Sequence, residues 1–314
     1  MVTNNSIIEW LLQGDPSIRW QVYADLLDKD EETIRKERKK ITTEGWGAKI
    51  LARQDEAGTW AGALYSPKWT STTYTLLLLR RLGLDPDNPG AQKGSRILLE
   101  KGFARDGGIN YWEKYSTQSE TCVTGLTLSI LAYFNIKDQR LISIAEHLLG
   151  VRMEDGGWNC RRPYGATHSS FHTTLIVLEA FREYLQKYEE HKEEILHARD
   201  RAVEFLLQHR LYKSHRTGRI VRPQMTQFCF PPRWKYDVMS VLDYLRSENI
   251  PKDERMQDAI DLLISRRKKD GTWLLPTPHS GRIFFELEKA GEPSRINTLR
   301  GMRILRWWEN QELP

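Results

Sequence analysis

The chain has 314 residues, 39% of them hydrophobic and 28% charged, a composition that excludes an intrinsically disordered protein. The formal net charge of +5 is too small to indicate a nucleic-acid-binding surface, but it suits an anionic small molecule or lipid headgroups. No signal-peptide pattern or apolar run of about 20 residues is present, so we expect a cytoplasmic protein whose membrane contact, if any, is peripheral. The three cysteines match neither a disulfide framework nor a C-x-x-C metal motif.

The predicted elements are helices throughout. A short helix over 6–12 precedes Asp15 and Pro16, which are a typical N-cap and first helical residue for the run that follows. The charged segment 30–40 predicts a helix edge or a loop excursion. Farther along, runs that are apolar on nearly every side alternate with amphipathic runs, as expected when multiply buried helices neighbour half-exposed ones. The buried runs begin near Asp15, Thr72, Glu120, Ser169, Tyr236 and Asn297.

Similar Gly-Trp segments separate these runs. They read QDEAGTW up to Trp60, ARDGGINYW up to Trp112, RMEDGGWNC around Trp158 and KKDGTW up to Trp273. Gly58, Gly107 and Gly156 recur at intervals of 49 residues, and such a period is typical of a repeat architecture. Glycine suits a chain reversal, and a large aromatic ring can cover the end of a helical hairpin, so we expect structural roles for these tryptophans.

Alternating buried and amphipathic helices are what two concentric rings require. The sequence therefore predicts an all-α protein, an (α/α)6 toroid, in which residues 1–314 form a single domain. An open solenoid of helical hairpins is the alternative, but it would expose half a unit at each end.

The Gly-Trp segments resemble the QW repeats of squalene and oxidosqualene cyclases and the related repeats of protein prenyltransferase β-subunits. Gln54 to Trp60 fits the ending Q-x-x-x-G-x-W, whereas the copies at 153–158 and 269–273 lack the glutamine. The resemblance covers about residues 45–308. It implies an α/α toroid that binds an isoprenoid in a central, aromatic-lined cavity.

Polar residues begin the predicted inner helices, where six helix N-termini would meet at one rim. His168 and His172 are four residues apart, a spacing that can ligate a metal if both are helical. Phe171 to Thr173 is similar to the Y-H-T that supplies a zinc-ligating histidine in protein prenyltransferases. The Asp-x-Cys partner of that motif has no counterpart beyond Cys122. We therefore expect no cofactor and no bound metal, and in particular no zinc at His172.

Asp237 matches one aspartate of the DxDDTA helix in terpene cyclases, where the central carboxylic acid protonates an alkene or an epoxide. The other carboxylates are absent, and the neighbouring Arg233 together with the helix N-terminus should keep Asp237 ionised. The simpler interpretation of Asp237 is a helix N-cap.

The predicted site combines these rim residues. We expect His172, Tyr236 and Asp237 to be catalytic if the protein is an enzyme, and Arg233 to lie beside them. The expected substrate-binding residues are Glu120, His168, Phe171, Arg233, Trp234 and Arg295. Aromatic residues near the rim could line an apolar cavity or form plain core: Trp69, Tyr74, Tyr111, Trp112, Tyr115, Phe171, Phe228, Phe230 and Trp234.

Three functions remain open from the sequence. The first is a terpene cyclase-like or prenyltransferase-like protein that acts on or binds an isoprenoid or another apolar small molecule. The second is a non-catalytic toroid that binds a ligand or a partner protein. The third is a saccharide-active toroid enzyme, for which His172, Tyr236, Arg233 and Glu120 could serve. Fold alone does not decide among them.

Overall fold

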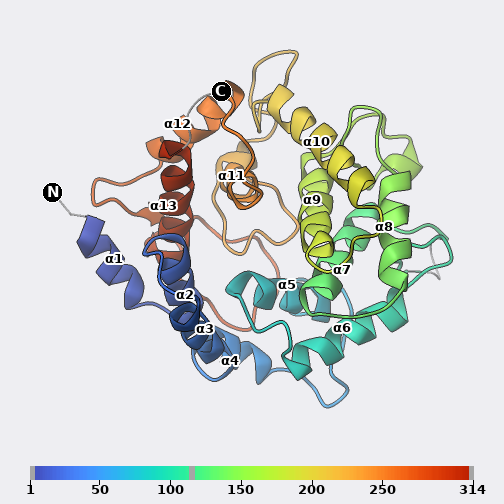
Figure 1. The fold of residues 1–314 in the computed structure, drawn as a ribbon, viewed down its shortest axis with the longest axis horizontal. Coiled ribbons are helices and arrows are strands. Elements are labelled where there is room, and N and C mark those ends of the chain that lie inside the picture. Colours follow the sequence, from blue (N-terminus) through green and yellow to red (C-terminus); the bar gives the residue numbers. More distant parts are fainter. Residues whose placement is uncertain (1–3, 113–116, 311–314) are drawn as a thin grey trace. The chain divides into compact units, whose positions relative to one another are not determined.

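The computed structural model describes residues 4–112 and 117–310, which are mostly helical (Figure 1). Within this part of the chain the named strands are two residues long each. The chain forms two compact units. Unit 1 comprises Met1–Ala52, Arg81–Asp85 and Leu207–Pro314, and unit 2 comprises Arg53–Arg80 and Pro86–Leu206.

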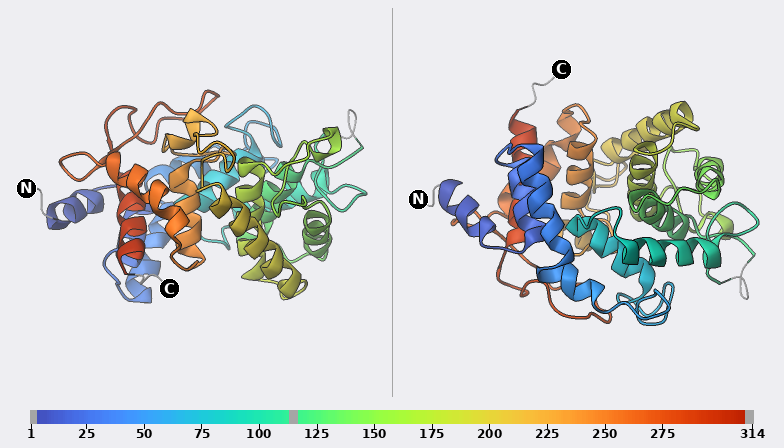
Figure 2. Two further views of the ribbon diagram at one scale, coloured as in Figure 1. Left: turned by 90° about the horizontal axis from the view of Figure 1, so that it is seen from above. Right: turned by 60° about the horizontal axis from the view of Figure 1, so that its bottom comes forward.

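Unit 1 contains the first and last described helices, α1 and α13. Its helices and 3-10 turns are α1 (Asn4–Leu12), α2 (Pro16–Asp25), α3 (Glu31–Lys39), η1 (Lys40–Thr42), α4 (Gly45–Leu51), η3 (Pro223–Thr226), α11 (Val238–Ser247), η4 (Glu254–Met256), α12 (Gln257–Ser265) and α13 (Arg295–Glu309). Strand β1 (Trp273–Leu274) pairs antiparallel with β2 (Pro293–Ser294). Helix α13 packs against both α2 and α11, and the views of Figures 1 and 2 show α2 beside α13.

Unit 2 is built of helical hairpins. It contains most of α5 (Thr72–Leu82), then α6 (Pro89–Gly102), α7 (Thr121–Tyr133), α8 (Arg140–Gly150), η2 (Arg162–Tyr164), α9 (Phe171–Leu185) and most of α10 (Lys192–Gln208). Helices α7 and α9 lie side by side and pack extensively (Figure 1). Nearly every residue of α7 is buried, whereas α8 buries only Leu141, Ile144, Ala145 and Leu148. The predicted contrast between fully buried and one-sided helices is therefore confirmed for this pair.

The helix boundaries agree closely with the sequence. The six predicted buried runs correspond to α2, α5, α7, α9, α11 and α13, and each begins within two residues of the expected position. Asp15 is the N-cap of α2 and accepts a hydrogen bond from the Ser17 amide at 2.9 Å, with Pro16 as the first helical residue. The segment 30–40, expected as a helix edge or loop, instead forms α3. The (α/α)6 toroid and the single domain stay predictions.

The Gly-Trp turns share one backbone geometry. Gly58, Gly107, Gly156 and Gly271 all have φ between +82° and +102°, which glycine adopts without strain. Trp60, Trp158 and Trp273 are at most 1% exposed, as their predicted structural role requires. The indole N–H groups of Trp158 and Trp273 donate to the carbonyls of Leu148 and Leu263, so each ring also satisfies the C-terminal end of the preceding helix.

A threonine near the start of the next helix fixes each turn. The backbone amides of Trp60, Trp158 and Trp273 donate to the hydroxyls of Thr72, Thr174 and Thr298, at 3.0, 3.0 and 3.1 Å. In the second copy the same bond runs from Ile109 to Thr124 at 3.0 Å. Ile109, which is fully buried, therefore occupies the position that the sequence assigned to Trp112. The prediction that Trp112 is the staple of its turn is wrong.

Replacing Thr174 with valine should test this turn. Valine keeps the shape of the side chain but leaves the buried Trp158 amide without its acceptor, and we expect a loss of about 1–3 kcal/mol in the free energy of unfolding. Urea denaturation would measure it. The exposed Thr217→Val should change the stability by less than about 0.5 kcal/mol, and equal values for the two variants would contradict this account.

Candidate functional site

Asp237 lies at the start of α11 in unit 1. It is the N-cap of that helix, and its Oδ1 accepts a hydrogen bond from the Ser240 amide at 2.8 Å. The residue is only 3% exposed. Burial raises the pKa of Asp237 above its ordinary value, and Arg300 and the Ser240 bonds offset this only in part. The sequence predicted the N-cap correctly but expected surrounding positive charge, not burial, to dominate the ionisation of this carboxyl.

Neighbouring predicted residues in unit 1 have structural partners. The buried Tyr236 hydroxyl donates to the Leu211 carbonyl, and burial raises the pKa of this tyrosine well above 10. Arg295, the first residue of α13, donates to the Trp10 carbonyl at 3.0 Å and lies over the Trp10 ring at 4.6 Å. These contacts tie α13 to α1. Whether Tyr236 and Arg295 also meet a ligand stays a prediction.

Arg233 and Trp234 precede α11 and are half-buried. The Lys235 ammonium lies 5.6 Å from the Trp234 ring centroid. Arg233 and Lys235 also face His279, whose pKa is lowered to about 4 by burial first and then by these two cations. His279 is therefore neutral at pH 7, and sequence analysis did not single it out.

The predicted residues of unit 2 lie around the starts of α7 and α9. Glu120 is the exposed residue before α7 and makes no side-chain cap bond. Phe171, the first residue of α9, is buried against Phe205, with ring centroids 5.4 Å apart. His172 follows it and is half-buried, whereas His168 is exposed and precedes the helix. The condition that both histidines are helical is therefore not met, and the two side chains do not share a helix face.

No group of three or more histidine, cysteine, aspartate or glutamate side chains within residues 4–112 and 117–310 could hold a metal ion. His172 belongs to unit 2 and Asp237, Tyr236 and Arg233 belong to unit 1. Their predicted grouping stays a prediction.

An aromatic cluster occupies the loops before α5 and α7 and the first turn of α5 in unit 2. We use this name for Tyr65, Trp69, Tyr74, Tyr111 and Trp112. Tyr65 is central, with its ring centroid 5.0 Å from both Tyr74 and Trp112 and 6.3 Å from Tyr111. Trp69 meets Tyr74 edge-on at 4.8 Å. Tyr115 lies outside the described residues.

The aromatic cluster is only partly buried. Trp69 and Tyr74 are 5% and 1% exposed, but Tyr65, Tyr111 and Trp112 each retain accessible surface. The Tyr111 hydroxyl bonds the Thr127 hydroxyl of α7 at 3.1 Å, which fixes its ring. Lys68 is exposed, and its ammonium lies 5.5 and 5.9 Å from the ring centroids of Tyr65 and Trp69. The cluster thus offers ring surface to a ligand with a cation at its edge.

Two thiols lie next to this cluster. Cys122 in the first turn of α7 lies beside Cys160, which follows the Trp158 turn. The Cys122 thiol donates to Glu120 Oε2 at 3.9 Å. The neighbouring Cys122 thiol is the main cause that lowers the pKa of Cys160 to about 6; burial opposes this shift and the Thr173 hydroxyl adds to it. Cys122 shifts the other way, well above 9. Burial, then Cys122 and Glu120, raise the pKa of Tyr65, which places the thiols beside the rings.

Sequence analysis missed this thiol pair because it treated Cys122 alone. The signal was available in the repeat, since Cys160 directly follows one Gly-Trp turn and Cys122 begins the helix of the preceding unit. Adjacent units of a helical repeat bring such positions together.

No helix in the described ranges is long and apolar enough to cross a membrane. No family model and no curated protein matches the sequence. Solved structures similar to the chain include a protein from Actinoplanes, with 15% identity over 95% of this chain and 91% of that one, at a TM-score of 0.46. They also include the type II terpene cyclase MstE from Scytonema without ligand, with 16% identity, 93% and 87% coverage and a TM-score of 0.45. A variant of MstE in complex with its substrate geranylgeranyl dihydroxybenzoate gives 14% identity, 93% and 85% coverage and a TM-score of 0.45.

Proposed function

We propose that this protein binds an isoprenoid or another apolar small molecule against the aromatic cluster of unit 2. The observation that carries the proposal is the partial exposure of Tyr65, Tyr111 and Trp112 in a cluster whose other members are buried. Ligand sites are typically apolar and aromatic with a few convergent polar groups, and here Lys68 and Glu120 supply charge at the edge. The proposal includes the toroid implied by the QW-like repeats.

The accessible rings are preorganised for such a ligand. Tyr111 is held by Thr127, and the edge-on contact of Tyr65 with Trp112 has an interplanar angle of 77°. A prenyl chain laid on these rings would remove apolar surface from water at about 25 cal/mol per Å². It would lose little side-chain entropy because the rings already contact one another.

Replacing Trp112 with alanine should weaken binding of geranylgeraniol, a C20 isoprenoid alcohol, at least about tenfold. The loss of ring contact and of buried area accounts for this, at roughly 1–2 kcal/mol. Isothermal titration calorimetry would measure the affinity. Trp46→Ala in α4 is the matched control, because Trp46 is also half-buried but lies in unit 1. Equal affinities for Trp112→Ala and wild type, or no binding by wild type, would refute the proposal.

Product analysis after wild type is incubated with geranylgeraniol would decide whether the ligand is converted. The second candidate function is catalysis with Asp237 as the proton donor. Burial raises the pKa of Asp237 and so favours the protonated form that alkene protonation needs. Asp237→Asn keeps an N-cap acceptor while removing the acid, so it should fold normally. If wild type yields a cyclised product, its loss in Asp237→Asn would support this role. Binding without any conversion would leave the protein a carrier or sensor of the ligand.

A further inference from the structure

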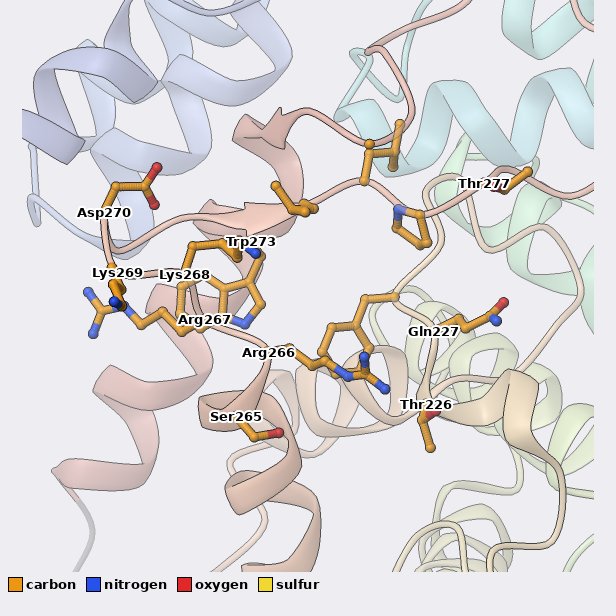
Figure 3. A pocket seen from close by; sticks show the side chains of 15 residues that line it. Thr226, Gln227, Ser265, Arg266, Arg267, Lys268, Lys269, Asp270, Trp273 and Thr277 are labelled. Atoms are coloured by element: carbon orange, nitrogen blue, oxygen red, sulfur yellow. The ribbon is translucent and has the colours of Figure 1, made fainter.

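A groove of about 970 Å³ lies in unit 1, between the segment that follows α12 and the segments 226–228 and 274–277. Its wall begins at Ser265 and runs through Arg266, Arg267, Lys268, Lys269 and Asp270. Figure 3 shows these side chains on one side and Gln227, Thr226 and Thr277 on the other. The volume is at the upper end of the range for small-molecule sites, about 300–1,000 Å³.

The floor of the groove is apolar. It is formed by Phe228, Trp273, Leu274, Leu275 and Pro276. Phe228, Trp273 and Leu275 are at most 5% exposed, so they are fixed in the core. Trp273 is held further by its own indole bond to the Leu263 carbonyl. Leu274 and Pro276 are half-buried and supply the accessible apolar surface above this fixed base.

The edge of the groove is strongly basic. Four consecutive cations, 266–269, adjoin the single carboxylate of Asp270, which leaves a net charge of +3. The Asp270 carboxylate accepts hydrogen bonds from the amide and the hydroxyl of Thr272, and these bonds stabilise the turn. Arg267 also serves the turn, because it donates to the Gly271 carbonyl and lies over the Trp273 ring.

Arg266 is different. It is exposed, and within the described chain its guanidinium makes no hydrogen bond or ion pair. Figure 3 shows its side chain reaching across the groove toward Gln227 and Thr226. An uncommitted guanidinium above an apolar floor matches a ligand with an anionic head and an apolar chain, because the head would gain charge-assisted bonds and the chain would cover the floor.

We propose that this groove binds a single-chain amphiphilic anion, with its phosphate or carboxylate on Arg266 and Lys268 and its chain along Leu274 and Pro276. A purely polar anion would leave the floor uncovered, and an uncharged chain would leave the basic edge unpaired. A free amphiphile fits this concave site better than a bilayer does, since only a single chain can enter a groove of this size. The site is independent of the aromatic cluster in unit 2.

The probe is dodecyl phosphate below its critical micelle concentration. The two comparison ligands are dodecanol, which has the chain without the anion, and inorganic phosphate, which has the anion without the chain. We expect dodecyl phosphate to bind at least about tenfold more tightly than either half by calorimetry. Arg266→Glu should weaken dodecyl phosphate at least about tenfold and leave dodecanol unchanged. Arg216→Glu is the matched control, because Arg216 is exposed in unit 1 but does not line the groove. Circular dichroism would verify that both variants fold.

Added salt should weaken dodecyl phosphate and spare dodecanol, because screening acts on the exposed charge pair alone. Equal binding of dodecanol and dodecyl phosphate, or an equal loss in Arg216→Glu and Arg266→Glu, would overturn the proposal. So would tighter binding to anionic phospholipid vesicles than to the monomeric probe, since that result would make the groove a membrane contact. Trp112→Ala should leave dodecyl phosphate binding unchanged, which separates this outcome from the test of the aromatic cluster.

Discussion

Replacing Asp243 with alanine is expected to lower the free energy of unfolding by about 3–5 kcal/mol, because it leaves a cluster of arginines without their shared anion. Asp243 lies in the middle of α11. Its carboxylate accepts bonds from Arg303 of α13, with Nε to Oδ1 at 2.8 Å, and from Arg246 at 3.1 Å. Arg300 of α13 is 3.8 Å away. Arg303 also pairs with Asp25 of α2 at 2.8 Å, so the network joins three helices of unit 1.

The matched control is Asp258→Ala. Asp258 also pairs with two cations, Lys213 at 2.7 Å and Arg210 at 3.2 Å, but it lies closer to the surface. Exposed pairs of this kind contribute about 0–1 kcal/mol, since solvent screens them. Urea unfolding of both variants would compare the two sites. A loss in Asp243→Ala no larger than in Asp258→Ala would show that the buried network does not hold the helices together.

The same carboxylate should make stability depend on pH. Burial alone would raise the pKa of Asp243, but Arg303, Arg246 and Arg300 together lower it well below its ordinary value. A group with a lowered folded-state pKa stabilises the fold above its unfolded pKa, about 3.9, and loses that contribution as the pH falls toward the folded value. Wild type should therefore lose stability below about pH 4 more steeply than Asp243→Asn does.

The sequence predicted the repeats better than it predicted their contacts. Helix starts follow from local patterns such as Asp15-Pro16, and these hold because caps and periodicity act within a few residues. The Asp243 network could not be foreseen, because Arg303 is 60 residues away and charge alone does not say which carboxylate meets it. Ile109 shows the same limit: two aromatic residues, Tyr111 and Trp112, follow the second turn, and only backbone register shows that isoleucine takes the buried position.

The sequence named most members of the aromatic cluster without assigning them to the site. Trp69, Tyr74, Tyr111 and Trp112 were expected near the helix starts, and the structure brings them together around Tyr65. Tyr65 itself was missed, because it lies in a loop without periodicity. Asp237 was correctly placed as an N-cap, but its burial was not predictable from neighbouring charges. Burial depends on how α11 packs, which local sequence does not encode.

Cys160 should react with iodoacetamide at pH 7 roughly 50-fold faster than Cys229, after allowance for the lower nucleophilicity of a low-pKa thiolate. The neighbouring Cys122 thiol is the main cause that lowers the pKa of Cys160 to about 6, whereas burial raises that of Cys229 to about 11. Cys160 also retains some exposure, while Cys229 is buried. Mass spectrometry of the modified peptides over pH 4.5–9 should give half-maximal alkylation of Cys160 near pH 6.

Cys122→Ala provides the control, because it removes the thiol beside Cys160 and leaves the Thr173 hydroxyl in place. The pKa of Cys160 should then rise, and its alkylation at pH 7 should slow because less thiolate is present. Thr173→Val should act in the same direction with a smaller effect, since Cys122 is the larger cause. A Cys160 profile centred near pH 8.5 in wild type, or one unchanged by Cys122→Ala, would show that the two thiols do not interact. If the pH profile of Cys160 alkylation shifts in both Cys122→Ala and Thr173→Val, the result would support a reactive Cys160 thiolate between the starts of α7 and α9, beside the aromatic cluster.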